Sequence, residues 1–156
     1  MIGHSIGGYT ALAVAGGHPM ALPHQTATGV AQPVEVELDA RVVAAVLLAP
    51  ALPWLMAPGA LADVHVPLLV RVGERDELLP AELVERVLAG LPATTRVDYQ
   101  VVPGAGHFSF QTPFPPAMVS PTFPPSQDPP GFDRPAYQRQ LLDEVTAFLR
   151  GAFTCP

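Results

Sequence analysis

Cysteine is nearly absent from the sequence. The 156 residues include a single one, Cys155, next to the carboxyl-terminal residue. One cysteine excludes a disulfide within the chain and a metal site built from several thiolates. Because terminal residues are usually mobile, we expect Cys155 to be a free surface thiol without a catalytic role.

Charged residues are also scarce, at 14%, and lysine is missing altogether. All eight basic residues are arginine, which we interpret as codon bias rather than chemistry. The formal net charge of -6 argues against nucleic acid or an anionic membrane surface as the main partner. No apolar run is long enough to cross a bilayer, and the longest, residues 42–52, has the size of a strand. No signal-peptide pattern follows Met1, so the compartment stays unknown and the cytoplasm is the default expectation.

Apolar residues are plentiful, at 49% of the chain. This content is typical of a packed globular protein rather than a disordered one. A chain of this length can build one domain with a real core but not two. We therefore expect a single domain over residues 1–156.

Continuous apolar stretches alternate with amphipathic ones, which is typical of an α/β protein with a parallel sheet. We expect strands over residues 42–49, 66–73 and 96–102, the last near a sheet edge because its pattern alternates. We expect helices over residues 6–16, 58–63, 80–91 and 134–150. The apolar side of the last helix is predicted to hold Tyr137, Leu141, Leu142, Val145, Phe148 and Leu149. Residues 20–36 show no periodicity and are predicted to form a loop.

Residues 108–135, the Pro-rich segment, are dense in proline with phenylalanines between the prolines. Neither a long helix nor a central strand tolerates that spacing, so we expect a surface loop within the domain. A proline-rich recognition ligand is the alternative. The phenylalanines favour packing onto the body of the protein.

The first residues carry the most specific motif. Gly3, Ser5 and Gly7 fit the pattern G-x-S-x-G, in which a serine sits on a sharp turn between a strand and a helix. Glycines on both sides of the serine allow strand and helix to approach closely. A helix rich in alanine follows at once, as this motif requires.

Ser5 is followed along the chain by Asp76 and then His107, each in the loop after a predicted strand. Because the carboxyl ends of parallel strands meet at one edge of the sheet, the three side chains are expected to lie together. In this arrangement histidine is the base for the serine hydroxyl, and the carboxylate orients the histidine. The backbone N–H of Ile6 is the expected oxyanion donor.

The chain resembles the carboxyl-terminal half of an α/β-hydrolase. It is most similar to the bacterial dienelactone-hydrolase-like group, which also resembles the platelet-activating-factor acetylhydrolases. The resemblance is carried by residues 3–9, 70–76, 103–110 and 128–134, which together run nearly the whole length. Members named for dienelactone hydrolysis have cysteine where this chain has Ser5. The resemblance therefore implies hydrolysis of small-molecule carboxylic esters through an acyl-enzyme, with no cofactor.

The chain departs from this family at its amino-terminal end. In the family several strands and helices precede the serine turn, whereas here only Met1 and Ile2 remain of its strand. We therefore expect a partial α/β-hydrolase domain whose amino-terminal strands are missing. An uncovered apolar sheet edge tends to associate, so self-association through that edge is expected.

Several residues have alternative interpretations. Ser5 could be a helix cap, His107 an incidental turn histidine, and Asp76 a solvated carboxylate with Glu74 as the next choice for the acid. His4 is expected to support the serine turn rather than to act in catalysis. No metal site is expected, since His18, His24 and His65 have no partners at ligand spacing. The side chains that could line a substrate pocket, or equally pack in the core or a lid, are Trp54, Phe108 and Phe110.

These patterns predict a serine-dependent carboxylic ester hydrolase. Ser5 is the expected nucleophile, His107 the base and then the acid, and Asp76 the orienting acid. Two rivals remain from other classes. One is a catalytically inactive fragment that keeps these residues without a working site. The other is a non-catalytic α/β module that binds a partner through its open sheet edge.

Overall fold

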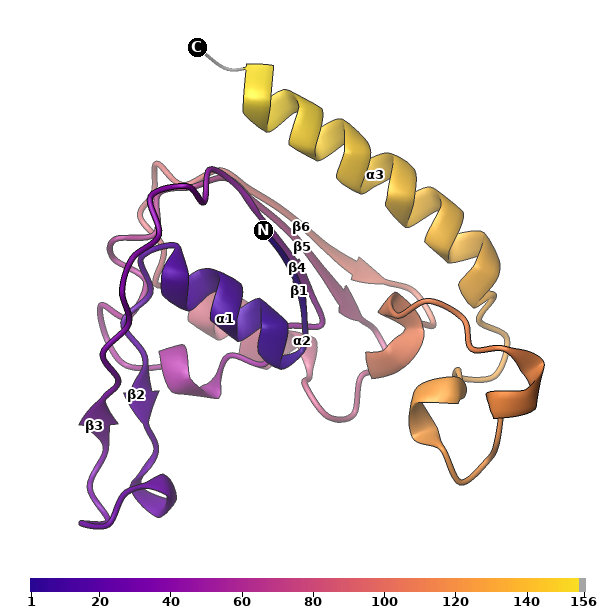
Figure 1. Cartoon of the computed structure of the whole chain (residues 1–156), viewed down its shortest axis with the longest axis horizontal. Helices are drawn as coiled ribbons and strands as arrows, with labels where there is room; N and C mark the ends of the chain where they lie inside the picture. Colours follow the sequence, from indigo (N-terminus) through magenta and orange to yellow (C-terminus); the bar gives the residue numbers. More distant parts are fainter. Residues whose placement is uncertain (155–156) are drawn as a thin grey trace.

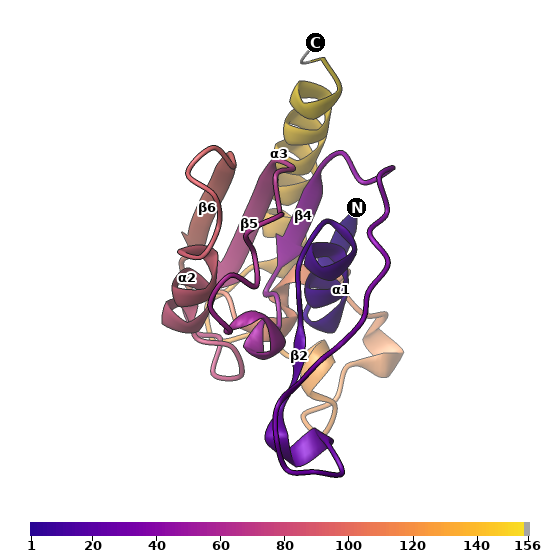
Figure 2. The same ribbon diagram turned by 90° about the vertical axis from the view of Figure 1, so that its left-hand side faces the viewer.

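The computed structural model describes residues 1–154, and Cys155 lies outside the described residues. Its centre is a parallel sheet of four strands in the order β1-β4-β5-β6 (Figure 2). The strands are β1 (Ile2–His4), β4 (Ala45–Leu48), β5 (Leu68–Gly73) and β6 (Val97–Val102). Every residue of β4 and β5 is buried, which explains their continuous apolar sequences. The alternating strand β6 lies at an edge, as its pattern predicts.

Helices cover both faces of the sheet. The helices α1 (Ile6–Val14) and α2 (Ala81–Leu88) lie on one face, and α3 (Arg134–Thr154) lies on the other (Figure 1). One hydrophobic cluster joins the sheet to α1 and α2, and a second joins it to α3. The protein is therefore an α/β structure with a mostly parallel sheet between two helical layers.

The buried sides of α2 and α3 are formed by apolar residues, as the sequence pattern predicts. In α2 the buried residues are Val84 and Val87, while Glu82, Glu85 and Arg86 are exposed. In α3 Tyr137 and Leu141 are buried, and Val145, Phe148 and Leu149 pack against the same cluster. The inclusion of Leu142 in this stripe is wrong, because its side chain is 66% exposed.

Two expectations about the connecting segments are wrong. Residues 20–36, predicted to be a loop, contain an antiparallel pair of two-residue strands, β2 (Met20–Ala21) and β3 (Gln32–Pro33). Residues 58–63 form turns rather than a helix, and the helical geometry falls earlier, in the short 3₁₀ helix Pro53–Leu55. Each of these elements is too short for a periodic pattern to reveal it.

The Pro-rich segment has neither an α-helix nor a strand before α3 begins, as its composition predicts. It contains the 3₁₀ helices Pro116–Met118 and Pro124–Ser126, and it begins within a third, His107–Phe110. The rings of Phe114 and Phe123 pack edge to face, with centroids 5.1 Å apart. No helix among residues 1–154 combines the length and the apolar character needed to cross a membrane.

Candidate active site

Ser5 occupies the sharp turn between β1 and α1. Its backbone has φ of 54° and ψ of -119°, a conformation that residues with a Cβ rarely adopt. Backbone hydrogen bonds hold it in place: Ser5 N donates to Leu48 O at 3.0 Å, and Ser5 O accepts from the N–H groups of Gly8 and Ala51. Strain of this kind costs about 1–3 kcal/mol and persists only where the surroundings enforce it. The turn therefore fixes the direction of the serine side chain.

The glycines around this turn differ in why they are needed. A Cβ on Gly3 would overlap the carbonyl oxygen of Gly7, and a Cβ on Gly8 would come within 2.7 Å of the Cβ of Pro50. A Cβ on Gly7 would meet no atom within 4 Å. The close approach of strand and helix thus depends on Gly3 and Gly8, and space around Gly7 would admit a side chain.

Ser5, His107 and Asp76 form one continuous chain of hydrogen bonds. His107 Nε2 lies 3.1 Å from Ser5 Oγ, and His107 Nδ1 lies 2.8 Å from Asp76 Oδ2. Ser5 directly follows β1, Asp76 lies in the loop after β5, and His107 lies in the turn after β6. The side chains of His107 and Asp76 are buried, with 7% and 0% exposed. The structure therefore brings together the three residues that sequence order selects.

Asp76, and not Glu74, is the carboxylate that contacts the histidine. The second oxygen of Asp76 accepts the backbone N–H groups of Leu78 and Leu79, at 3.0 and 2.9 Å. Glu74 instead accepts the N–H of Gly104 at 2.8 Å. Because both oxygens of Asp76 have donors, its carboxylate has a fixed orientation against the imidazole ring.

This chain of contacts selects one tautomer of His107. An ionised carboxylate only accepts hydrogen bonds, so Nδ1 of His107 carries the proton and Nε2 presents its lone pair to the hydroxyl of Ser5. An imidazole in that state can take the proton of the serine as the oxygen attacks an electrophile. The N–H of Ile6 lies in the first turn of α1, where backbone donors have no carbonyl of a preceding turn to bind.

His4 has a supporting position beside Ser5, where it contacts the segment that carries His107. Its Nε2 donates to the carbonyl oxygen of His107 at 2.8 Å, and its Nδ1 accepts the side-chain N–H of Gln111 at 3.3 Å. Burial lowers the pKa of His4 from its ordinary value of 6.5, and the bond to the His107 carbonyl opposes this to a smaller extent. A neutral His4 thus holds the backbone of His107.

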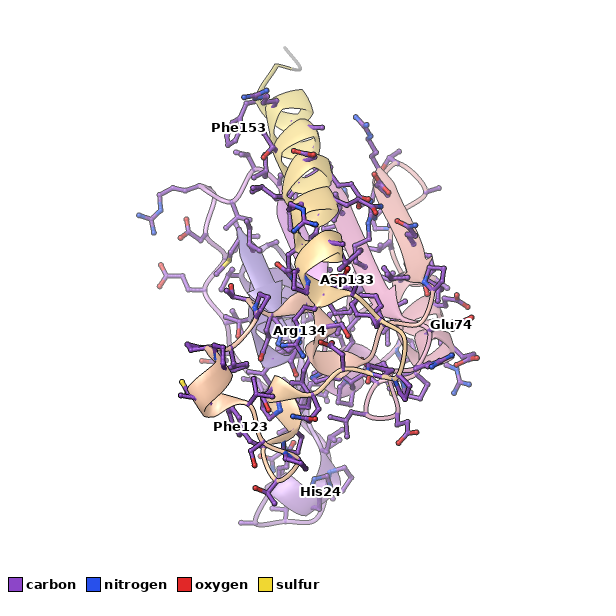
Figure 3. The ribbon with its side chains drawn as sticks, turned by 90° about the vertical axis from the view of Figure 1, so that its right-hand side faces the viewer. His24, Glu74, Phe123, Asp133, Arg134 and Phe153 are labelled. Carbon is purple, nitrogen blue, oxygen red and sulfur yellow. The ribbon has the colours of Figure 1, made fainter. Side chains whose placement is uncertain are left out.

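A second supporting network was not identified from sequence. The buried hydroxyl of Ser109 accepts the N–H of Gly106 and donates to Asp128 at 2.7 Å. Asp128 in turn accepts from Nε of the buried Arg134 at 2.8 Å. Figure 3 shows Arg134 at the first turn of α3, beside the Pro-rich segment. This network ties the turn that carries His107 to the Pro-rich segment. In the sequence, the only sign of this network is that residues 128–134 belong to the stretches that carry the family resemblance.

The three aromatic residues suggested for a substrate pocket lie in different surroundings. Phe108 lines an open pocket of about 600 Å³ beside His107. Phe110 is buried in the second core cluster and packs edge to face on Tyr137. Trp54 packs against Tyr9, and its indole N–H donates to Gln25. Phe108 is therefore the one of the three that borders this pocket.

No group of three or more His, Cys, Asp or Glu side chains among residues 1–154 is arranged to hold a metal ion. His18 instead pairs with Asp63, at 2.7 Å on the surface.

No family model matches the chain. Two curated proteins of Mycobacterium tuberculosis are similar to part of it: the uncharacterized protein MT2364 of strain CDC 1551 / Oshkosh and the uncharacterized protein Rv2307c of strain ATCC 25618 / H37Rv. Each is 47% identical to this chain over 47 residues, which are 30% of the chain. The similar stretch spans only 16% of the length of either relative.

Proposed function

We propose that the protein is a serine-dependent carboxylic ester hydrolase of the α/β-hydrolase lineage. The single observation that carries the proposal is the hydrogen-bonded chain from Asp76 through His107 to Ser5, with the serine on a strained strand-to-helix turn. The chain order Ser, Asp, His is the order used by α/β-hydrolases. A serine that served only as a helix cap would not need a buried histidine and carboxylate aligned behind it.

In the proposed reaction, Ser5 Oγ attacks the carbonyl carbon of the ester while its proton passes to Nε2 of His107. The oxygen of the tetrahedral intermediate becomes negative and accepts the N–H of Ile6. When the carbon–oxygen bond breaks, His107 returns the proton to the departing alkoxide, which leaves as the alcohol. Water then attacks the acyl-enzyme with His107 again as base, releasing the carboxylic acid and restoring Ser5. Asp76 keeps the imidazole oriented throughout.

Burst kinetics with p-nitrophenyl acetate test this proposal. We expect a rapid release of about one equivalent of nitrophenol per chain, followed by slower turnover, because this activated ester acylates the serine faster than water hydrolyses the acetyl-enzyme. The burst should disappear in Ser5→Ala and after heat unfolding. A folded chain that gives no burst, or a burst that survives Ser5→Ala, contradicts the proposal and favours an inactive fragment or an interaction module.

A further inference from the structure

The open pocket of about 600 Å³ lies on one side of the proposed site. Its walls come from the loop after β5, the turn after β6 and the Pro-rich segment, and they include Leu78 and Phe108. Of the three residues in the hydrogen-bonded chain, His107 lines this pocket, and Ser5 and Asp76 are not among its lining residues. The pocket therefore borders the site on the histidine side.

The lining is mainly apolar. Side chains of Leu78 and Phe108 face prolines of the Pro-rich segment, Pro124, Pro129 and Pro130. Leu78 is 63% exposed, so its side chain is accessible to a ligand in this pocket.

The pocket is lined by charged side chains of both signs, Arg75, Glu77 and Asp128. The carboxylate of Asp128 is bound by Ser109 and Arg134. The guanidinium of Arg75 donates to the carbonyl oxygen of Pro130 at 3.2 Å, and Glu77 brings the opposite charge to the same lining. Because side chains of both signs are present, the lining selects for neither sign of charge on a ligand.

The wall formed by the Pro-rich segment is fixed in advance. Arg134 donates to the carbonyl oxygens of Pro125 and Gln127 as well as to Asp128, all at 2.8–2.9 Å. A preformed apolar pocket binds a ligand without the loss of conformational entropy that ordering its walls would require.

We propose that this pocket binds the alcohol half of the ester, and that this half is an uncharged apolar group. The inference rests on the proposed function: the acyl carbon bonds to Ser5, whereas the leaving oxygen takes its proton from His107. A pocket that is lined by His107 and not by Ser5 is therefore placed for the leaving alcohol rather than for the acyl group.

Two ester series test the assignment by activity. In acetate esters of methanol, butanol and benzyl alcohol, kcat/KM should rise with the size of the alcohol. Leu78→Ala should lower the benzyl-to-methyl ratio about tenfold, the factor that corresponds to the loss of some 1.4 kcal/mol of apolar contact. It should leave the selectivity among methyl esters of different acids unchanged. Leu142→Ala is the matched control, because Leu142 is equally exposed, at 66%, but lies on α3. A change in acyl selectivity instead, or no change, overturns the proposal.

A binding measurement tests, without catalysis, whether the pocket binds an apolar alcohol. Benzyl alcohol, titrated into the whole chain and followed by methyl NMR, should shift the signals of Leu78 and leave those of Leu142 in place. Absence of a shift at Leu78 overturns the pocket assignment even if the chain hydrolyses esters. Binding at Leu78 in a chain that gives no nitrophenol burst supports the pocket and refutes the proposed function.

Discussion

The backbone of Ser5 is strained, and the hydrogen bonds around it hold it in this conformation. Ser5 and Ala49 are the two non-glycine residues with positive φ among those the structure describes. They lie close together, since Ser5 N donates to Leu48 O and Ser5 O accepts from Ala51 N. Ala49 N donates to Arg71 O on β5, so backbone hydrogen bonds to neighbouring strands hold both residues of this strained corner. For the proposed reaction, this fixed position means that Ser5 needs little rearrangement before it attacks.

Asp76, rather than Glu74, is the carboxylate that contacts His107, and this assignment can be tested by substitution. Asp76→Asn should lower the rate of the nitrophenol burst by about 10³–10⁴-fold, because an amide in that place favours the wrong tautomer of His107. Glu74→Gln is the matched control, since Glu74 binds a backbone N–H outside the hydrogen-bonded chain and should leave the rate within about twofold of the original. Stopped-flow absorbance measures both. An equal loss in the two variants would refute the assignment of Asp76.

His4 makes a prediction about pH. Its pKa is lowered in the folded protein, so the folded state resists protonation while the unfolded chain takes up a proton near pH 6.5. The stability that neutral His4 provides is therefore present above about pH 6.5 and is lost as the pH falls below it. The titrating and charged groups that face His4 are His107 and Asp76.

His4→Gln keeps a donor for the His107 carbonyl but cannot titrate. Comparison with this variant therefore isolates the pH dependence of stability that His4 contributes. Free energies of unfolding from urea titrations should show the original protein losing stability relative to His4→Gln between pH 7.5 and pH 5. A difference between the two proteins that stays constant over this range would contradict the burial-driven shift.

The residues of the site that sequence could predict are those fixed by the order of motifs along the chain. Ser5, Asp76 and His107 each follow a strand, and strand order in a parallel sheet puts such residues at one edge. The contacts of His4 and of Ser109 could not be predicted, because each joins positions far apart in sequence: His4 bonds to the carbonyl of His107, and Ser109 bonds to the carboxylate of Asp128. The burial of Phe110 was equally hidden, since an aromatic residue beside a site can face either the pocket or the core.

At the scale of elements, the packing of α1 against the segment that follows β4 depends on close approach at Gly8. Gly8→Ala should lower the free energy of unfolding by about 1–3 kcal/mol, because the new Cβ would press on Pro50. Gly7→Ala is the paired change in the same helix. It meets open space and should raise stability by up to about 1 kcal/mol, since alanine favours helix over glycine. Denaturant unfolding of both variants checks this, and the reverse ranking would contradict it.

The junction of α3 with the Pro-rich segment depends on one arginine. Arg134→Met removes donors from Asp128 and two carbonyl oxygens and should lower the free energy of unfolding by about 1–3 kcal/mol. It should also speed proteolysis within the Pro-rich segment. In the control, Arg41→Met, the lost partner is Asp39 on the surface, with the arginine 90% exposed, and the loss of stability should be much smaller. Similar losses in both variants would show that Arg134 does not anchor the segment.

Element types followed from sequence where a pattern extended over several residues. The buried strands β4 and β5 have continuous apolar runs, and α2 has a clear stripe. The pair β2–β3 and the short 3₁₀ helices could not be found this way, because two or three residues carry no period. The prediction that Leu142 lies on the apolar side of α3 is wrong for another reason. It lies one residue beyond Leu141, and a step of 100° along a helix takes the side chain off the buried face.

At the scale of the whole molecule, the sheet has two edges among the described residues, β1 and β6. The β1 edge is apolar, since Met1 and Ile2 are 46% and 56% exposed. Self-association through this edge stays a prediction, and sedimentation velocity over a range of concentrations would test it. If it occurs, Ile2→Lys should shift the population toward monomer.

The assembly of β1, β5 and β6 around one reactive serine is tested most directly by the intact mass of the folded chain after exposure to a fluorophosphonate. A serine with an aligned histidine reacts with this reagent, whereas an ordinary surface serine does not. We expect a single adduct, located at Ser5, that is absent in Ser5→Ala and in the heat-unfolded chain. A folded chain that remains unmodified would show that Ser5, His107 and Asp76 lie together without forming a working nucleophile.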